Sequence, residues 1–96
     1  MANYVMLLQW TDQGIRNVKD TTKRARAASE FATKMGVKLA DAFWTLGSYD
    51  LTLIVEAPDD ETITAFALKL ASLGNVKTQT MRAYRAKEMD AILGKV

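Results

Sequence analysis

Two β-prone runs separated by a short turn, within residues 42–58, constrain the fold more than any other part of the sequence. Both runs are rich in aromatic and β-branched residues, and Gly47 lies between them, so the stretch predicts two strands joined by a tight hairpin. Gly47 is expected to adopt a positive φ, which glycine reaches at no steric cost. The run after the turn alternates, which predicts one apolar, buried face and one mixed face.

The rest of the chain supplies two more strands and two long helices. Strands are expected over residues 3–10, 37–46, 49–57 and 76–85, and long helices over residues 23–35 and 59–73. A helical turn at 15–18 is expected before the first long helix. An amphipathic tail at 87–93 is expected to dock through Met89, Ile92 and Leu93. Apolar residues recur every three or four positions in both long helices, which predicts one buried side on each.

The resulting order, β-α-β-β-α-β, predicts an α+β fold of the ferredoxin-like type. Two right-handed crossovers on one four-stranded antiparallel sheet place both helices on the same face. We expect a single domain over residues 1–96, with a core over about 3–85 and a C-terminal tail over 86–96.

The face of this sheet that carries no helices is expected to be apolar in part. Its expected residues are Thr52, Ile54 and Glu56 from the third strand, Ala42, Trp44 and Leu46 from the second, and either Thr80, Arg82 and Tyr84 or their alternates from the fourth. Because exposed sheets of this kind are normally covered, we expect a second copy to pack on it and form a barrel-like homodimer or higher homo-oligomer.

The sequence contains neither cysteine nor histidine, which excludes disulfides, thiolate metal sites and Ser-His-Asp or Cys-His catalysis. Asp59, Asp60 and Glu61 form one acidic cluster, interpreted as the capped start of a helix, so no metal and no cofactor are expected. Basic residues are interleaved with acids at a net charge of +2, which predicts no nucleic-acid partner. No apolar run approaches the roughly 18 residues that span a bilayer, and no export signal is recognisable, so we expect a cytoplasmic protein without membrane association.

A Gly-x-Tyr-Asp pattern at residues 47–50 is the most distinctive of several short motifs. The others are Thr-Asp-Gln-Gly at 11–14, Lys-Arg-Ala at 23–25, Val-Glu-Ala-Pro-Asp-Asp at 55–60, Leu-Gly-Asn-Val at 73–76 and Thr-Gln-Thr at 78–80. Together they make the chain resemble the GYD-domain family of small bacterial and archaeal proteins, from about Tyr4 to Tyr84. The resemblance implies the dimeric α/β-barrel type of ferredoxin-like fold, and it implies no particular activity.

Seven residues are candidates for a ligand site, because they bring polar atoms into an otherwise apolar enclosure. They are Trp10, Arg24, Trp44, Tyr49, Asp50, Glu56 and Arg82. A buried Arg or Glu needs a partner, which a ligand can supply. The structural alternative is that Glu56 pairs with Arg82, or across a dimer interface, that Asp50 and Tyr49 hold the hairpin, and that the stem of Arg24 packs while its head reaches solvent.

Two functional hypotheses follow from the fold and composition. The first is a homo-oligomeric domain that binds a small molecule in the cavity between sheet and helices. The second is a cofactor-independent enzyme, monooxygenase- or isomerase-like, with a compact hydrophobic substrate and with Asp50 or Glu56 as general base. The enzyme hypothesis rests on analogy with related dimeric α/β-barrel families. A third, a regulatory effector-binding module, usually accompanies a DNA-binding domain, for which 96 residues leave no room.

Overall fold

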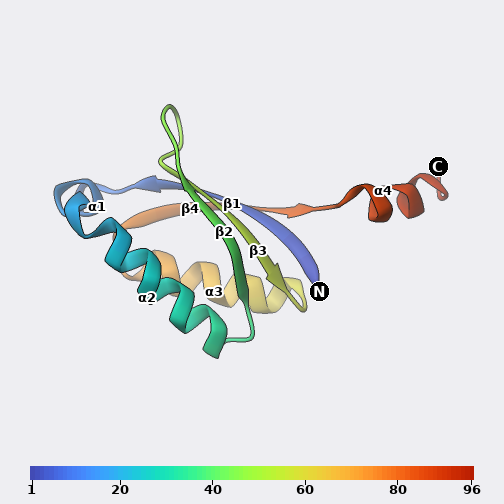
Figure 1. Ribbon diagram of the computed structural model, residues 1–96, viewed down its shortest axis with the longest axis horizontal. Helices are drawn as coiled ribbons and strands as arrows, with labels where there is room; N and C mark the ends of the chain where they lie inside the picture. The colour runs from blue at the N-terminus through green and yellow to red at the C-terminus, as the bar shows by residue number, and fades with distance from the viewer.

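The computed structural model describes all residues from Met1 to Val96 and has the predicted β-α-β-β-α-β core (Figure 1). Its strands are β1 (Ala2–Trp10), β2 (Lys38–Trp44), β3 (Leu51–Ala57) and β4 (Val76–Ala83). Its helices are α1 (Asp12–Arg16), the 3-10 turn η1 (Val18–Asp20), α2 (Thr21–Lys34), α3 (Asp60–Ser72) and α4 (Ala86–Leu93). The strands form one antiparallel sheet in the order β2-β3-β1-β4, so the ferredoxin-like prediction is confirmed.

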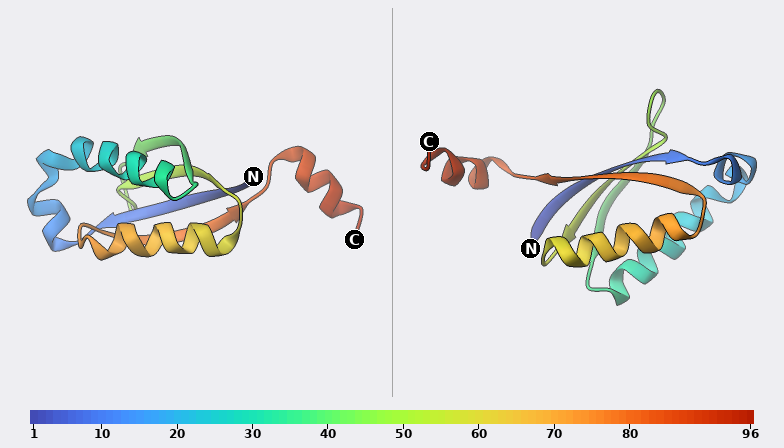
Figure 2. Two further views of the ribbon diagram at one scale, coloured as in Figure 1. Left: turned by 90° about the horizontal axis from the view of Figure 1, so that it is seen from below. Right: turned by 180° about the vertical axis from the view of Figure 1, so that it is seen from behind.

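The two long helices, α2 and α3, cover one face of this sheet (Figure 2). The alternation of β3 places Leu51, Leu53 and Val55 under them, in register with Leu8, Met6 and Tyr4 of β1. The ring of Phe66 on α3 is fully buried, and its centroid lies 5.6 Å from that of Phe31 on α2. The hydrophobic core therefore lies between the central strands and the helix pair.

Two side chains cap helix starts. The Thr11 hydroxyl accepts a hydrogen bond from the Gly14 amide at 3.1 Å and begins α1. The Asp59 carboxylate accepts one from the Thr62 amide at 2.8 Å and begins α3, at the acidic cluster that the sequence marked as a helix start. The 3-10 turn η1 separates α1 from α2, and Asp20, the N-cap residue of α2, makes no capping hydrogen bond.

The assignment of β2 side chains to faces was wrong. Ala42 and Trp44 lie opposite Leu53 and Leu51 and so face the helices, whereas Phe43 lies on the open face. The cause is an irregularity between Leu39 and Asp41, where the register shifts by one residue. Because side chains alternate with a period of two, one extra residue turns over every side chain that follows.

The connection between β2 and β3 is a six-residue loop rather than a tight turn, and it projects beyond the sheet (Figure 1). The strands therefore end at Trp44 and begin at Leu51, inside the predicted limits. Gly47 has a φ of +121°, which confirms the expected positive value. Leu46 was expected on the open sheet face, but it lies in this loop and is fully exposed.

The open face of the sheet is partly apolar and carries no helix. Its apolar side chains are Val5, Leu7, Phe43, Ile54 and Met81, alongside the expected Thr52 and Glu56. On β4 the alternates Gln79, Met81 and Ala83 face this side, while Thr80 and Arg82 face the helices.

The C-terminal helix α4 projects away from the rest of the domain (Figure 1). The expected docking residues Met89 and Leu93 are exposed, so they do not dock within this chain. None of the helices combines the length and the apolar character that crossing a bilayer requires.

Candidate functional site

A cavity of about 290 Å³ lies between the helix pair and the sheet. Thirteen of its sixteen lining residues are hydrophobic, drawn from all four strands and from α2 and α3. The lining residues with polar side-chain atoms are Trp10, Thr21, Arg24 and Asn75. The cavity is therefore an apolar enclosure with a few polar groups, which is the usual composition of a small-molecule site.

Trp10, at the end of β1, contributes its indole ring to the cavity wall. Its backbone amide donates to the Asp50 carboxylate at 2.8 Å, which fixes the end of the strand. Its indole Nε1 is buried and has no hydrogen-bond partner. A buried donor without an acceptor costs free energy, and no accessible surface of this nitrogen faces the cavity.

Arg24 extends from α2 toward the α1 turn. Its guanidinium donates to the carbonyl of Asn17 at 2.6 Å and to that of Gly14 at 3.3 Å. Its side chain also lines the cavity. A guanidinium has five N–H donors, so three of the five remain without a protein partner.

Trp44 does not line the cavity, but it contacts Thr21, which does. The Trp44 indole Nε1 donates to the Thr21 hydroxyl oxygen at 2.9 Å, and Thr21 lines the cavity. This contact joins the end of β2 to the first turn of α2. It also leaves the Thr21 hydroxyl proton free to donate.

Four motif residues that were not site candidates contact one another beside the cavity, and Asn75 among them lines it: Thr11, Gln13, Gly14 and Asn75. The Thr11 amide donates to the Asn75 carbonyl at 3.0 Å, and the Gln13 side-chain amide donates to the Asn75 side-chain oxygen at 2.9 Å. A Cβ on Gly14 would lie 2.0 Å from the Asn75 carbonyl oxygen, so only glycine fits there. The signal was present, because these residues belong to the Thr-Asp-Gln-Gly and Leu-Gly-Asn-Val motifs.

Tyr49 and Asp50 hold the hairpin at this end of the sheet. The predicted role of Asp50 as an anchor through backbone amides takes an unexpected form, because its carboxylate accepts from Trp10 on β1 rather than from the turn. The Tyr49 hydroxyl donates to the Gln79 side chain at 2.8 Å, on the open face. Residues of three sequence motifs thus lie together at one end of the sheet, and Trp10 contacts one of them.

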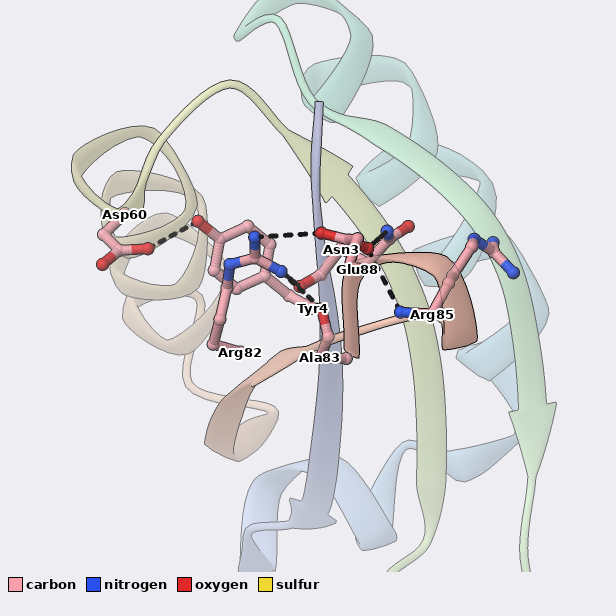
Figure 3. Close-up of polar contacts among 7 residues, drawn as sticks. All are labelled: Asn3, Tyr4, Asp60, Arg82, Ala83, Arg85 and Glu88. Atoms are coloured by element: carbon pink, nitrogen blue, oxygen red, sulfur yellow. Dashed lines mark hydrogen bonds and ion pairs between the residues drawn. The ribbon is translucent and has the colours of Figure 1, made fainter. Parts of the chain in front are cut away.

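Arg82 and Glu56 lie away from this cavity. Arg82 belongs to a polar cluster at the root of α4 (Figure 3). Its guanidinium donates to the backbone of Asn3 at 3.2 Å and of Ala83, and it lies 3.5 Å from the Glu88 carboxylate. Glu56 is on the open face, 3.7 Å from the Lys38 ammonium. Within the chain, Glu56 therefore pairs with Lys38 and Arg82 with Glu88, rather than Glu56 with Arg82.

Two ionisable groups in the cluster around Arg82, Tyr4 and Glu88, have shifted pKa values. Burial, together with a 2.6 Å hydrogen bond to the Asp60 carboxylate, raises the pKa of Tyr4 to about 12. The Arg85 amide, which donates to the Glu88 carboxylate at 3.1 Å, lowers the pKa of that carboxyl group. Burial dominates the shift of the Tyr4 pKa, and a backbone hydrogen bond dominates that of Glu88.

The cavity is equipped for binding rather than for proton transfer. No carboxylate lines it, since Asp50 is held by the Trp10 amide and Glu56 faces the other side of the sheet. Of the seven predicted residues, Trp10 and Arg24 line the cavity and Trp44 and Asp50 contact its lining residues. Tyr49, Glu56 and Arg82 lie outside it.

The comparisons with known proteins agree with the motifs. Residues 4–93 match the GYD domain family. A Thermus thermophilus protein named "Glutamine synthetase and cystathionine beta-lyase binding protein" is 32% identical over 94 residues, which cover 97% of this chain and 99% of that protein.

Solved structures resemble this chain at the level of the fold. A crystal structure of a Thermus thermophilus protein has a TM-score of 0.59 at 24% identity, over 90% of this chain and 96% of the other. An ACT domain protein from Streptococcus pneumoniae has a TM-score of 0.51 at 15% identity, over 86% and 90% of the two chains. The match over residues 4–93, together with the 32% identical relative, shows that the chain belongs to the GYD-domain family.

Proposed function

We propose that this chain is a homo-oligomeric binding domain that takes one compact, largely apolar small molecule into the cavity between its sheet and its helices. The single observation that carries the proposal is the apolar cavity of about 290 Å³. Concave sites lined mostly by apolar side chains with a few polar groups are where small molecules usually bind, so this cavity favours a ligand.

The polar groups at the cavity end support the same reading. The partly engaged Arg24 guanidinium lines the cavity together with Thr21 and Asn75. Buried polar groups are normally satisfied, and a ligand with hydrogen-bonding atoms would satisfy these.

The enzyme hypothesis receives no support from the geometry. Its two proposed general bases, Asp50 and Glu56, do not line the cavity. A general base must lie within hydrogen-bonding reach of the proton that it removes. The relative from Thermus thermophilus is named for binding two enzymes, which supports a binding role here through protein partners and not through a small molecule.

The homo-oligomeric part of the proposal rests on two surfaces of the same chain that have no partner. The open sheet face exposes Phe43 and Met81, and α4 exposes Met89 and Leu93. Hydrogen bonds from Asn3 and Arg82 to Glu88 hold the first turn of α4, which projects away from the sheet (Figure 1). In a dimer with a two-fold axis, each copy offers the other both of these surfaces. We therefore propose that a second copy of the chain covers the open sheet face and α4.

The test of ligand binding uses 4-methylpentan-1-ol, a compact and uncharged probe. In ¹H–¹⁵N NMR spectra, we expect the indole N–H resonance of Trp10 to shift with saturation as the alcohol is added. Filling the cavity by Ala25→Phe should abolish the shift, because Ala25 lines the space that the probe enters.

The matched control is Ala65→Phe, which adds the same ring at an exposed position of α3. This variant should bind the alcohol as the parent does. Absence of any saturable shift in the parent, or equal binding by Ala25→Phe, would refute the proposed cavity.

A further inference from the structure

We infer that the ligand of this cavity is a monocarboxylate with a compact apolar body and without an ammonium group. This inference rests on the proposed function and adds the chemical class of the ligand. It comes from the hydrogen-bonding capacity of the four polar lining residues, Trp10, Thr21, Arg24 and Asn75.

All four residues offer donors. The Trp10 indole nitrogen is a donor without a partner, but the atom has no accessible surface, so recognition rests on the other three residues. The oxygen of Thr21 already accepts from Trp44, which leaves its proton to donate. The side-chain oxygen of Asn75 already accepts from Gln13, which leaves its amide N–H groups.

Arg24 adds a positive charge to these neutral donors. Both of its hydrogen bonds within the protein go to backbone carbonyls, so no carboxylate neutralises it. An anionic oxygen would accept from the guanidinium in a charge-assisted hydrogen bond, which is stronger than a bond between neutral groups. A planar carboxylate matches the fork of donors on a guanidinium.

The polar residues that line the cavity also disfavour a cationic ligand. The cavity lining holds no aspartate or glutamate, so a buried ammonium would have no carboxylate to pair with. An ammonium would also be repelled by Arg24. The cavity therefore favours a simple carboxylic acid over an amine or a zwitterion with the same apolar body.

The experiment compares four probes with one apolar body: 4-methylpentanoate, 4-methylpentanamide, 4-methylpentan-1-ol and 4-methylpentan-1-amine. Affinities are measured by calorimetry at pH 7, where the carboxylate is ionised. We expect the carboxylate to bind about 10- to 100-fold more tightly than the amide and the alcohol, and the amine to bind most weakly.

Arg24→Met keeps the stem of the side chain and removes its charge. It should abolish the preference for the carboxylate, so that the carboxylate and the alcohol bind this variant with similar affinities. Arg26→Met, at an exposed position of the same helix, should leave the whole series unchanged. Arg24→Lys keeps the positive charge and should retain part of the preference for the carboxylate. This variant tests the role of the charge if Arg24→Met does not fold.

The outcomes separate this inference from the proposed function. If the alcohol or the amide binds as tightly as the carboxylate, or if the amine binds best, the inference of a monocarboxylate is overturned and the cavity remains a binding site. If no probe binds, the proposed function fails and the inference fails with it. A carboxylate preference that persists in Arg24→Met assigns recognition to other groups and overturns the role of Arg24.

Discussion

The two faces of the sheet are built from the same strands, yet they differ in what covers them. On the helix side, Leu53 and Val55 lie beneath α2 and α3 and are buried. On the other side, Ile54 lies between them in sequence and has no covering element in this chain. The helix side also holds the cavity of about 290 Å³, with Arg24, Thr21 and Asn75 in its lining. We therefore propose that the helix side takes a small molecule and that the open face takes a protein surface.

Neighbouring residues of β3 offer the sharpest test of this difference. Leu53→Ala should lower the free energy of unfolding by about 2–5 kcal/mol at every protein concentration, because it removes a buried side chain from the core. Ile54→Ala should instead weaken self-association and change the stability of the separated chain little. Chemical denaturation at several protein concentrations distinguishes the two effects, and equal behaviour of the variants would break the comparison.

The projecting hairpin borders the open face through Gln9 and Tyr49. Gly47→Val should cost about 1–3 kcal/mol, because Gly47 has a φ of +121°, where a side chain strains the backbone. No atom lies within 4 Å of an added Cβ, so the loss would come from the backbone alone. Ser48→Val, at a position without a positive φ, is the control. Thermal melting of Gly47→Val together with the parent protein would contradict the account of the turn.

The helix-covered face should also respond to high pH through Tyr4. The pKa of Tyr4 in the folded protein is about 12, against an ordinary value of 10.0, so the unfolded chain loses this proton first. The stabilisation is therefore complete below pH 10 and is lost as the pH rises toward 12. With an allowance for solvent at the exposed Asp60, the loss should be about 1–2 kcal/mol. Denaturation of Tyr4→Phe between pH 9 and 12 should lack this loss, whereas Tyr84→Phe should retain it.

The smallest expected effect concerns Asp50, whose carboxylate fixes the end of β1 beside the cavity. Asp50→Asn should change the free energy of unfolding by less than about 0.5 kcal/mol, because the amide oxygen can still accept from the Trp10 backbone. Asp50→Ala leaves that amide without its partner and should cost about 1 kcal/mol. A loss of several kcal/mol in Asp50→Asn would show that the negative charge itself is required.

Local sequence signals predicted most of the fold. The alternation of β3 identified its buried side, Gly47 identified the loop, and Thr11 and Asp59 identified helix starts. These features depend on residues close together in the sequence, so one sequence suffices to find them. The face of β2 was not predictable in this way, because one extra residue near Ala40 changes the alternation and leaves no distinct mark in composition.

The candidate site was predictable only in part, because it depends on tertiary contacts. Trp10 and Arg24 were identified by residue type, as polar groups in an apolar context. Asn75 was not, although its carbonyl approaches Gly14 too closely for any other residue at position 14. Such approaches join segments about sixty residues apart. Arg82 and Glu56 were assigned to the same enclosure, but they lie on opposite faces of the sheet.

The mass of the protein in solution tests the division between the two faces most directly. Sedimentation equilibrium at micromolar concentration measures it without any variant or ligand. We expect at least twice the chain mass of 10.7 kDa, because we propose that a second copy covers the open face. A mass of 10.7 kDa at every concentration would contradict the account, because the open face would then be exposed to solvent in the working protein.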